Sequence, residues 1–249
     1  MFGACTCLAM VGGPIQAFID SDFCGQLIVI TQIVMSVGSW AVFLGKFSAL
    51  KAINARSRRF ADDFARQDDP LTLYCDKGYP FEDSPLETVY RRTSERFVKL
   101  IPRRQLLLLQ QDATACPTLT PAQMELVAST CAHATDEETV TLNRGLTALA
   151  VVTSSAPLLG LFGTVWGVML AFQAMAASGS ANIAELAPGI SSALLTTVVG
   201  LVVAIPSTIA YNILQAKLEA FTVQLEGFGE ELIGKLSLNY VASEKGGVC

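Results

Sequence analysis

Charged residues are scarce in this 249-residue chain and absent from two long stretches. Asp, Glu, Lys and Arg make up 16% of the residues, against about a quarter in an average soluble domain. None of them occurs from Gly145 to Ala184 or from Leu186 to Ala216. Hydrophobic residues reach 51% and the mean hydropathy is +0.46, so the composition indicates a membrane protein with several spans.

Other absences exclude whole classes of function. The chain lacks a basic patch with interleaved aromatic residues, so we expect no nucleic-acid partner. Its seven cysteines show no paired C-x-x-C spacing, and His133 is the single histidine, so we expect no metal and no cofactor. Ser154 and Ser155 have no His or Lys base at membrane depth, which argues against a hydrolase or any other enzyme.

Three apolar runs predict three transmembrane helices, at 26–45, 147–177 and 186–216. About 20 apolar residues suffice to cross a bilayer as a helix. The loop at 178–185 is short, so spans two and three are expected to form an antiparallel hairpin. The predicted fold class is an all-α membrane protein whose helices extend into a cytoplasmic helical domain.

The distribution of Lys and Arg predicts the orientation in the membrane. All 17 of them fall within 46–144 or 217–249, and none falls within 1–25 or 178–185. Lys and Arg accumulate on the cytoplasmic side of membrane spans. We therefore expect a periplasmic N-terminal segment at 1–25 and a periplasmic loop at 178–185. The helical domain at 46–146 and the C-terminal helix at 217–249 are expected in the cytoplasm.

Capping signatures predict the helices outside the membrane. Ser84-Pro85-Leu86-Glu87 is expected to start a helix that ends near Leu100, and 103–111 could form another. Thr120-Pro121-Ala122-Gln123 is a second signature, and we expect one helix to run from there into span two. Spans one and three are both expected to continue as helices into the cytoplasm.

Small and hydroxyl-bearing residues mark one face of the hairpin. Gly160, Gly163 and Gly167 recur at helical spacing, which in lipid favours close helix packing. Thr164 lies 13 residues before the turn at 177–186 and Thr197 lies 11 residues after it, so we expect the two hydroxyls to be level. Level hydroxyls on neighbouring helices can form part of a polar lining.

Two further polar residues and two prolines complete the candidate set. We expect Ser192 and Thr196 to line the same polar path as Thr164 and Thr197. Pro157 and Pro206 lie inside spans, where each frees a carbonyl and tends to kink the helix. No ionisable residue lies at mid-membrane depth, although such a group usually marks an ion path. If protons cross here, a partner has to bring the titrating group.

The hairpin resembles the MotA/TolQ/ExbB proton-channel family, in its ExbB/TolQ branch. The resemblance rests on the Ala156-Pro157-Leu158-Leu159-Gly160-Leu161-Phe162-Gly163-Thr164-Val165-Trp166-Gly167 block and on three shorter motifs. These are Arg144-Gly145-Leu146, Ala187-Pro188-Gly189-Ile190, and Ala193-Leu194-Leu195 followed by Thr197, Gly200 and Ala204-Ile205-Pro206.

The resemblance implies a subunit of an energy-transducing complex in a bacterial inner membrane. Family members of this branch form a homopentamer around a pore that holds single-span partners of the ExbD/TolR kind. Those partners carry an essential Asp, and proton flow drives TonB-linked uptake or TolA-linked envelope maintenance. The pore-facing threonines of the family correspond to Thr164 and Thr197.

One position departs from the family pattern. Family members usually carry Glu where this chain has Ser192, in Pro188-Gly189-Ile190-Ser191-Ser192. A neutral hydroxyl cannot titrate there, and Glu185 lies seven residues earlier at the outer mouth. Two hypotheses follow: a channel subunit that relies on its partner's acid, or a non-conducting scaffold that assembles the partner helices. The missing carboxylate favours protons over sodium ions, because hard cations prefer oxygen ligands.

Overall fold

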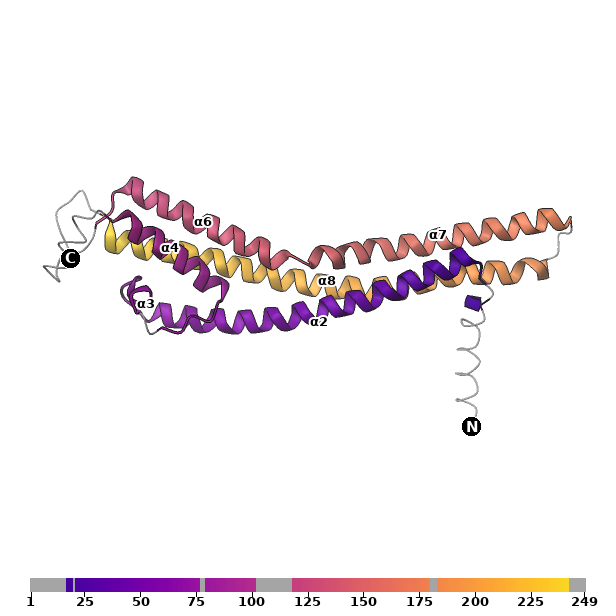
Figure 1. Ribbon diagram of the computed structural model, residues 1–249, viewed down its shortest axis with the longest axis horizontal. Helices are drawn as coiled ribbons and strands as arrows, with labels where there is room; N and C mark the ends of the chain where they lie inside the picture. The colour runs from indigo at the N-terminus through magenta and orange to yellow at the C-terminus, as the bar shows by residue number, and fades with distance from the viewer. Residues whose placement is uncertain (1–16, 20, 77–78, 102–117, 180–182, 242–249) are drawn as a thin grey trace, which may run out of the picture. The chain divides into compact units, whose positions relative to one another are not determined.

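The computed structural model describes residues 17–19, 21–76, 79–101, 118–179 and 183–241, without the side chains of 184 and 185. Six helices are named in Figure 1: α2 (Phe23–Ala65), α3 (Thr72–Cys75), α4 (Pro85–Leu100), α6 (Pro121–Asn143), α7 (Leu146–Ser178) and α8 (Ile183–Tyr240). The described ranges contain helices and no strand, which confirms the all-α prediction. The short helix expected at 103–111 lies outside the described residues.

The chain divides into two compact units. The membrane unit comprises Met1–Phe47 and Gly145–Gln215, and the extramembrane unit comprises Ser48–Arg144 and Ala216–Cys249. Three helices are long and apolar enough to cross a bilayer, and they lie in Phe23–Ala65, Leu146–Ser178 and Leu186–Tyr240. Spans one and three therefore do continue as helices past their apolar segments, as expected.

The helix that starts at Pro121 does not continue into span two, so that expectation was wrong. α6 ends at Asn143, where the Arg144 amide donates to the Thr141 carbonyl at 3.3 Å. Gly145 then takes a left-handed backbone with φ 91°, and α7 begins at Leu146. Glycine adopts positive φ without the steric cost that a Cβ imposes, so this single residue suffices to interrupt the helix.

Small side chains bring the helices of the membrane unit together. Ala156 on α7 and Val203 and Ala204 on α8 form a buried cluster, against which Met35 of α2 packs. Many large apolar side chains on these helices stay exposed, among them Leu158, Phe162, Val165, Val198 and Val202. A water-facing surface of this kind would be unfavourable, so these faces suit lipid or neighbouring membrane helices.

Both capping signatures form in the extramembrane unit. The Ser84 hydroxyl accepts from the Glu87 amide at 3.3 Å, and the Glu87 carboxylate accepts from the Ser84 amide at 3.0 Å. Thr120 and Gln123 make the same reciprocal pair at the start of α6. Each box satisfies two amides that an isolated helix start leaves without partners.

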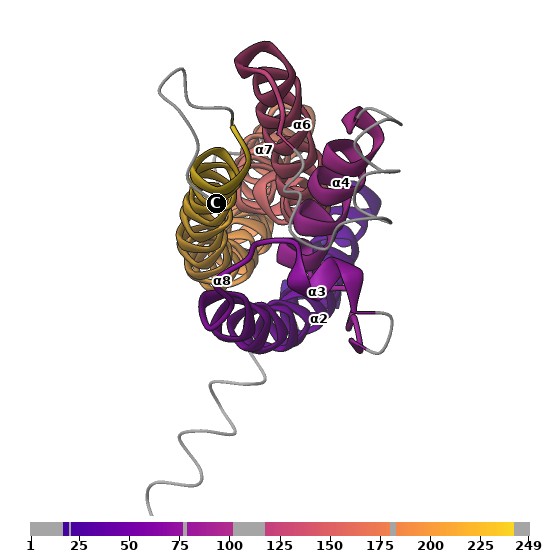
Figure 2. The ribbon, with the colours of Figure 1, turned by 90° about the vertical axis from the view of Figure 1, so that its left-hand side faces the viewer.

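Aromatic side chains form the core of the extramembrane unit. Phe60 and Phe64 of α2 contact Tyr90 of α4 and Phe228 of α8, with ring centroids 5.1 to 5.8 Å apart. The Tyr90 hydroxyl donates to the Pro70 carbonyl at 2.7 Å and accepts from the Tyr74 amide at 3.0 Å. These bonds offset the cost of burying a polar group. Figure 2 shows α4 beside α6, against which it packs.

Candidate functional site

Three glycines of α7 lie at its closest approach to α8. A Cβ on Gly160 would fall 2.9 Å from both the Thr196 carbonyl oxygen and the Thr197 Cα. A Cβ on Gly163 would fall 2.7 Å from Thr196 Cβ, and one on Gly167 would fall 2.7 Å from Ala193 Cβ. Real Cβ atoms do not approach other heavy atoms this closely, so the contact between the two spans depends on the absence of side chains at these positions.

A cluster of threonine hydroxyls occupies this contact. The Thr164 and Thr197 Oγ1 atoms lie 2.9 Å apart and share a hydrogen bond. The two residues therefore do lie level, and their part in a proton path stays a prediction. The Gly160 carbonyl is within hydrogen-bond distance of three hydroxyls: Thr197 at 2.9 Å, and Thr164 and Thr196 at 3.1 Å each.

The cluster offers more acceptors than its hydroxyls can use at once. Each hydroxyl carries one hydrogen, so it donates a single bond while its oxygen can accept others. Thr164 can donate to Gly160, to Leu161 or to Thr197, and Thr197 can donate to Gly160 or to Thr164. The bond between the two threonines can therefore reverse its direction without movement of the heavy atoms, as a hydroxyl relay requires.

The four predicted path residues differ in exposure. Thr164 and Thr197 are partly exposed, whereas Thr196 is 1% exposed and Ser192 is 7% exposed. Ser192 donates to the Gly189 carbonyl of its own helix at 3.0 Å, and it makes no bond to the threonine cluster. The structure thus brings Thr164, Thr196 and Thr197 together. The two partly exposed threonines, Thr164 and Thr197, stay accessible to a neighbouring helix.

The prolines lie inside continuous helices. Pro157 is within α7 and Pro206 is within α8. A proline lacks the amide that would bond to the carbonyl four residues earlier. The carbonyls of Thr153 and Val202 therefore lack their usual helical donor. A flexible joint at either position stays a prediction.

Sequence reasoning missed the residue that joins all three spans. Gln32 of α2 is 0% exposed, and its Nε2 donates to the Ala156 carbonyl at 3.3 Å and to the Thr196 carbonyl at 3.2 Å. A second contact between spans one and three joins the buried Ser39 and Ser207 hydroxyls at 3.0 Å. The available signal was an amide side chain in the interior of a mainly apolar span.

Asp22 directly precedes α2 and is an acidic side chain next to the apolar segment of span one. Its carboxylate accepts from the Gly25 amide at 3.2 Å and from the Trp166 Nε1 at 3.0 Å. Acids favour helix N-termini because the exposed amides there carry partial positive charge. Asp22 therefore fixes the start of α2 against α7, and the threonine cluster itself contains no titratable group.

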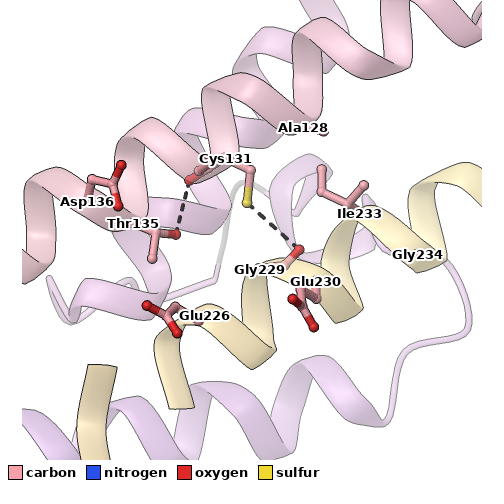
Figure 3. Close-up of a pocket in the computed structure, with 10 residues that line it drawn as sticks. Ala128, Cys131, Thr135, Asp136, Glu226, Gly229, Glu230, Ile233 and Gly234 are labelled. Carbon is pink, nitrogen blue, oxygen red and sulfur yellow. Dashed lines mark hydrogen bonds between the residues drawn. The ribbon is translucent and has the colours of Figure 1, made fainter. Parts of the chain in front are cut away.

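The extramembrane unit has a separate groove between α6 and α8 (Figure 3). The cavity measures about 520 Å³, with Cys131, Thr135 and Gly229 among the residues that line it. The Cys131 thiol donates to the Gly229 carbonyl at 3.8 Å, and burial raises the pKa of that thiol, which makes it a poor nucleophile. No group of His, Cys, Asp and Glu poised for a metal occurs in the part of the chain that the structure describes.

A sequence model of the MotA/TolQ/ExbB proton channel family matches residues 103–227, half of the chain. The chain belongs to this family. The matched range contains α6, α7, the threonine cluster and most of α8. Family membership and three apolar helices together make the chain a multi-pass inner-membrane protein.

Three curated relatives illustrate the similarity. The Tol-Pal system protein TolQ of Pseudomonas aeruginosa is 35% identical over 207 residues, which cover 83% of this chain and 84% of that protein. The TolQ protein of Haemophilus influenzae is 29% identical over 221 residues, with 87% and 90% covered. The biopolymer transport protein ExbB of Pseudomonas putida is 38% identical over 106 residues, with 42% and 32% covered.

Proposed function

We propose that this protein is an ExbB/TolQ-like subunit that conducts protons together with a partner and so converts the proton-motive force into mechanical work. The observation that carries the proposal is the hydrogen bond between Thr164 and Thr197, which joins spans two and three at 2.9 Å. A reversible hydroxyl pair at membrane depth is suited to passing a proton. Lipid offers a hydroxyl no hydrogen-bond partner, so the pair suits a contact between helices better than a lipid-facing surface.

The partner has to supply the acid. The apolar segments of the three spans contain no Asp, Glu, Lys, Arg or His, and Ser192 stands where the family usually has Glu. Proton paths through membranes usually need a titratable side chain. We therefore assign that group to a single-span ExbD/TolR-like protein, whose helix would pass close to the exposed sides of Thr164 and Thr197.

The proposed assembly is a homopentamer around the partner helices, with the N-terminus in the periplasm and the C-terminus in the cytoplasm. The exposed apolar faces of α7 and α8 support contacts with neighbouring helices, and the distribution of Lys and Arg supports the orientation. A TonB-like or TolA-like protein would carry the motion to an outer-membrane process. The TolQ proteins match 83% and 87% of this chain, whereas the ExbB protein matches 42% of it, and this longer match favours envelope maintenance over uptake.

The test is potential-driven proton flux in vesicles that hold the chain and its single-span partner. Thr164→Val and Thr197→Val keep the shape of the side chains and remove the hydroxyls. Thr208→Val is the matched control, because Thr208 is exposed and bonds only to the Ala204 carbonyl of its own helix among the contacts described. We expect flux to fall in the first two variants and to persist in the control. Unchanged flux in all three would contradict the proposal.

One observation favours a second function, that of a non-conducting scaffold. Ser192 is 7% exposed and bonded to its own helix, so it offers a partner neither charge nor a free hydroxyl. A complex that keeps its full cellular function when the partner's acid is replaced by Asn would support the scaffold. A complex that loses function in this way would support conduction.

A further inference from the structure

A buried amide on span one donates to one backbone carbonyl on each of the other two spans. Gln32 is fully buried in the membrane unit, and its Nε2 donates to the Ala156 and Thr196 carbonyls. The orientation of the amide is set by its surroundings, because both neighbours are carbonyl oxygens and can only accept. One NH2 group therefore uses both of its hydrogens, one on α7 and one on α8.

Two glycines create the space that this amide fills. A Cβ on Gly200 would lie 2.9 Å from Gln32 Nε2, and a Cβ on Gly160 would lie 3.4 Å from it. The same Cβ on Gly200 would lie 2.7 Å from the Ala156 carbonyl oxygen. Any larger residue at position 200 would thus displace the amide from its acceptors. The space for the amide exists only where α2, α7 and α8 meet.

The two carbonyls that Gln32 holds lie on the backbone segments that lead to the hydroxyl pair. The Thr196 carbonyl belongs to the peptide bond that joins Thr196 to Thr197. The Ala156 carbonyl lies one helical turn before Gly160, whose own carbonyl is an acceptor for Thr164 and Thr197. A single amide therefore joins the two backbones next to Thr197 on α8 and about two helical turns before Thr164 on α7, and it restricts their separation near the hydroxyl pair.

We propose that Gln32 is a positioning residue that sets the separation of the Thr164 and Thr197 hydroxyls. Its importance for proton flow rests on the function proposed above, whereas its effect on the separation does not. In the membrane no water competes for the two carbonyls, so loss of the amide leaves α7 and α8 without this common link. The pair would then sample wider separations, at which the hydroxyls no longer meet.

The separation can be measured without reference to proton flow. Thr164→Cys and Thr197→Cys are introduced together, and the disulfide between these positions is quantified by peptide mass spectrometry after mild oxidation in membranes. Gln32→Met keeps the length of the side chain and removes its polar atoms. Thr31→Val is the matched control, because Thr31 is exposed on the same helix and bonds to its own Leu27 carbonyl.

We expect Gln32→Met to slow disulfide formation about tenfold per folded protein, the factor expected for two interhelical hydrogen bonds in a membrane. Thr31→Val should leave the rate unchanged. If Gln32→Met does not fold, Gln32→Asn decides, since its amide is one methylene too short to reach both carbonyls. An unchanged rate in the folded variant would overturn the proposal.

Flux measurements then separate this proposal from the proposed function. In the chain with both threonines, Gln32→Met should reduce proton flux. In the Thr197→Val background the same change should cause no further loss of flux, because both changes disable the same hydroxyl pair. If Gln32→Met lowers flux by the same factor in both backgrounds, Gln32 acts independently of the hydroxyl pair, and the positioning role would be overturned. A slowed disulfide together with a wild-type complex that passes no protons would uphold the positioning role and reject the proton path.

Discussion

Replacement of Gly163 by Ala tests the packing on which the threonine cluster depends. The new Cβ would lie 2.7 Å from Thr196 Cβ and 3.0 Å from Thr196 Cγ2. Thr196 is 1% exposed and cannot move away without giving up its bond to the Gly160 carbonyl. We therefore expect α7 and α8 to move apart by several tenths of an ångström and to weaken the hydroxyl cluster.

Gly38→Ala supplies a matched control for the magnitude. Gly38 lies mid-helix in α2, and a Cβ there would meet nothing within 4 Å. Both variants gain the roughly 0.5–1 kcal/mol by which Ala exceeds Gly in a helix, so this contribution cancels when they are compared. Overpacking of a tight contact typically costs about 1–3 kcal/mol, and Gly163→Ala should be less stable than Gly38→Ala by that amount.

The assay is reversible unfolding in mixed micelles, followed by tryptophan fluorescence. The chain has two tryptophans, Trp40 and Trp166, and both belong to the membrane unit, so the signal reports on that unit. The reasoning would be refuted if the two alanine variants unfolded at the same detergent composition. It would also be refuted if Gly163→Ala proved the more stable of the two.

Four further outcomes are expected. Tyr90→Phe should lower the free energy of unfolding by about 1–3 kcal/mol, since it leaves the Pro70 carbonyl and the Tyr74 amide without their partner; an unchanged chemical-denaturation curve would contradict this. Burial raises the pKa of Glu87, so the stability that this group contributes is present in acid and is lost as the pH rises through the raised pKa. Glu87→Gln, which keeps the cap acceptor, should therefore gain in Tm relative to the wild type as the pH rises from about 4 to about 7, and a constant difference would speak against it. Cys75 is exposed and should react with an impermeant maleimide only after the inner membrane is opened, as followed on the peptide that contains it; labelling of Cys75 itself in intact spheroplasts would reverse the proposed orientation. Ser192→Glu should raise proton flux in the reconstituted complex if the missing carboxylate limits conduction, and equal flux in both proteins would show that it does not.

Local features of the sequence were enough to predict much of the fold. The apolar runs predicted three spans, and the two capping boxes at Ser84 and Thr120 formed with the expected partners. The level placement of Thr164 and Thr197 followed from counting residues on both sides of a short turn. Each of these features depends on residues that are close together in the sequence. The apolar periodicity, the segment length and the capping residues are therefore sufficient to predict them.

Contacts between segments could not be read in the same way. The sequence contains Gln32 and Gly200, but 168 positions separate them, and no local pattern indicates that they face each other. The burial of Ser192 and Thr196, in contrast to the partial exposure of Thr197, likewise depends on how α8 is rotated against α7. The interruption at Gly145 depends on a backbone conformation that glycine permits but does not require.

The sequence by itself determined that the chain forms apolar helices with glycine and threonine at matched depth, because the bilayer forces every backbone group into a helix. The tertiary structure alone decided which hydroxyls meet, and it revealed that an amide from span one holds the other two spans together. The physical reason is that lipid supplies no hydrophobic force between helices, so their rotation and separation are set by individual close contacts and hydrogen bonds.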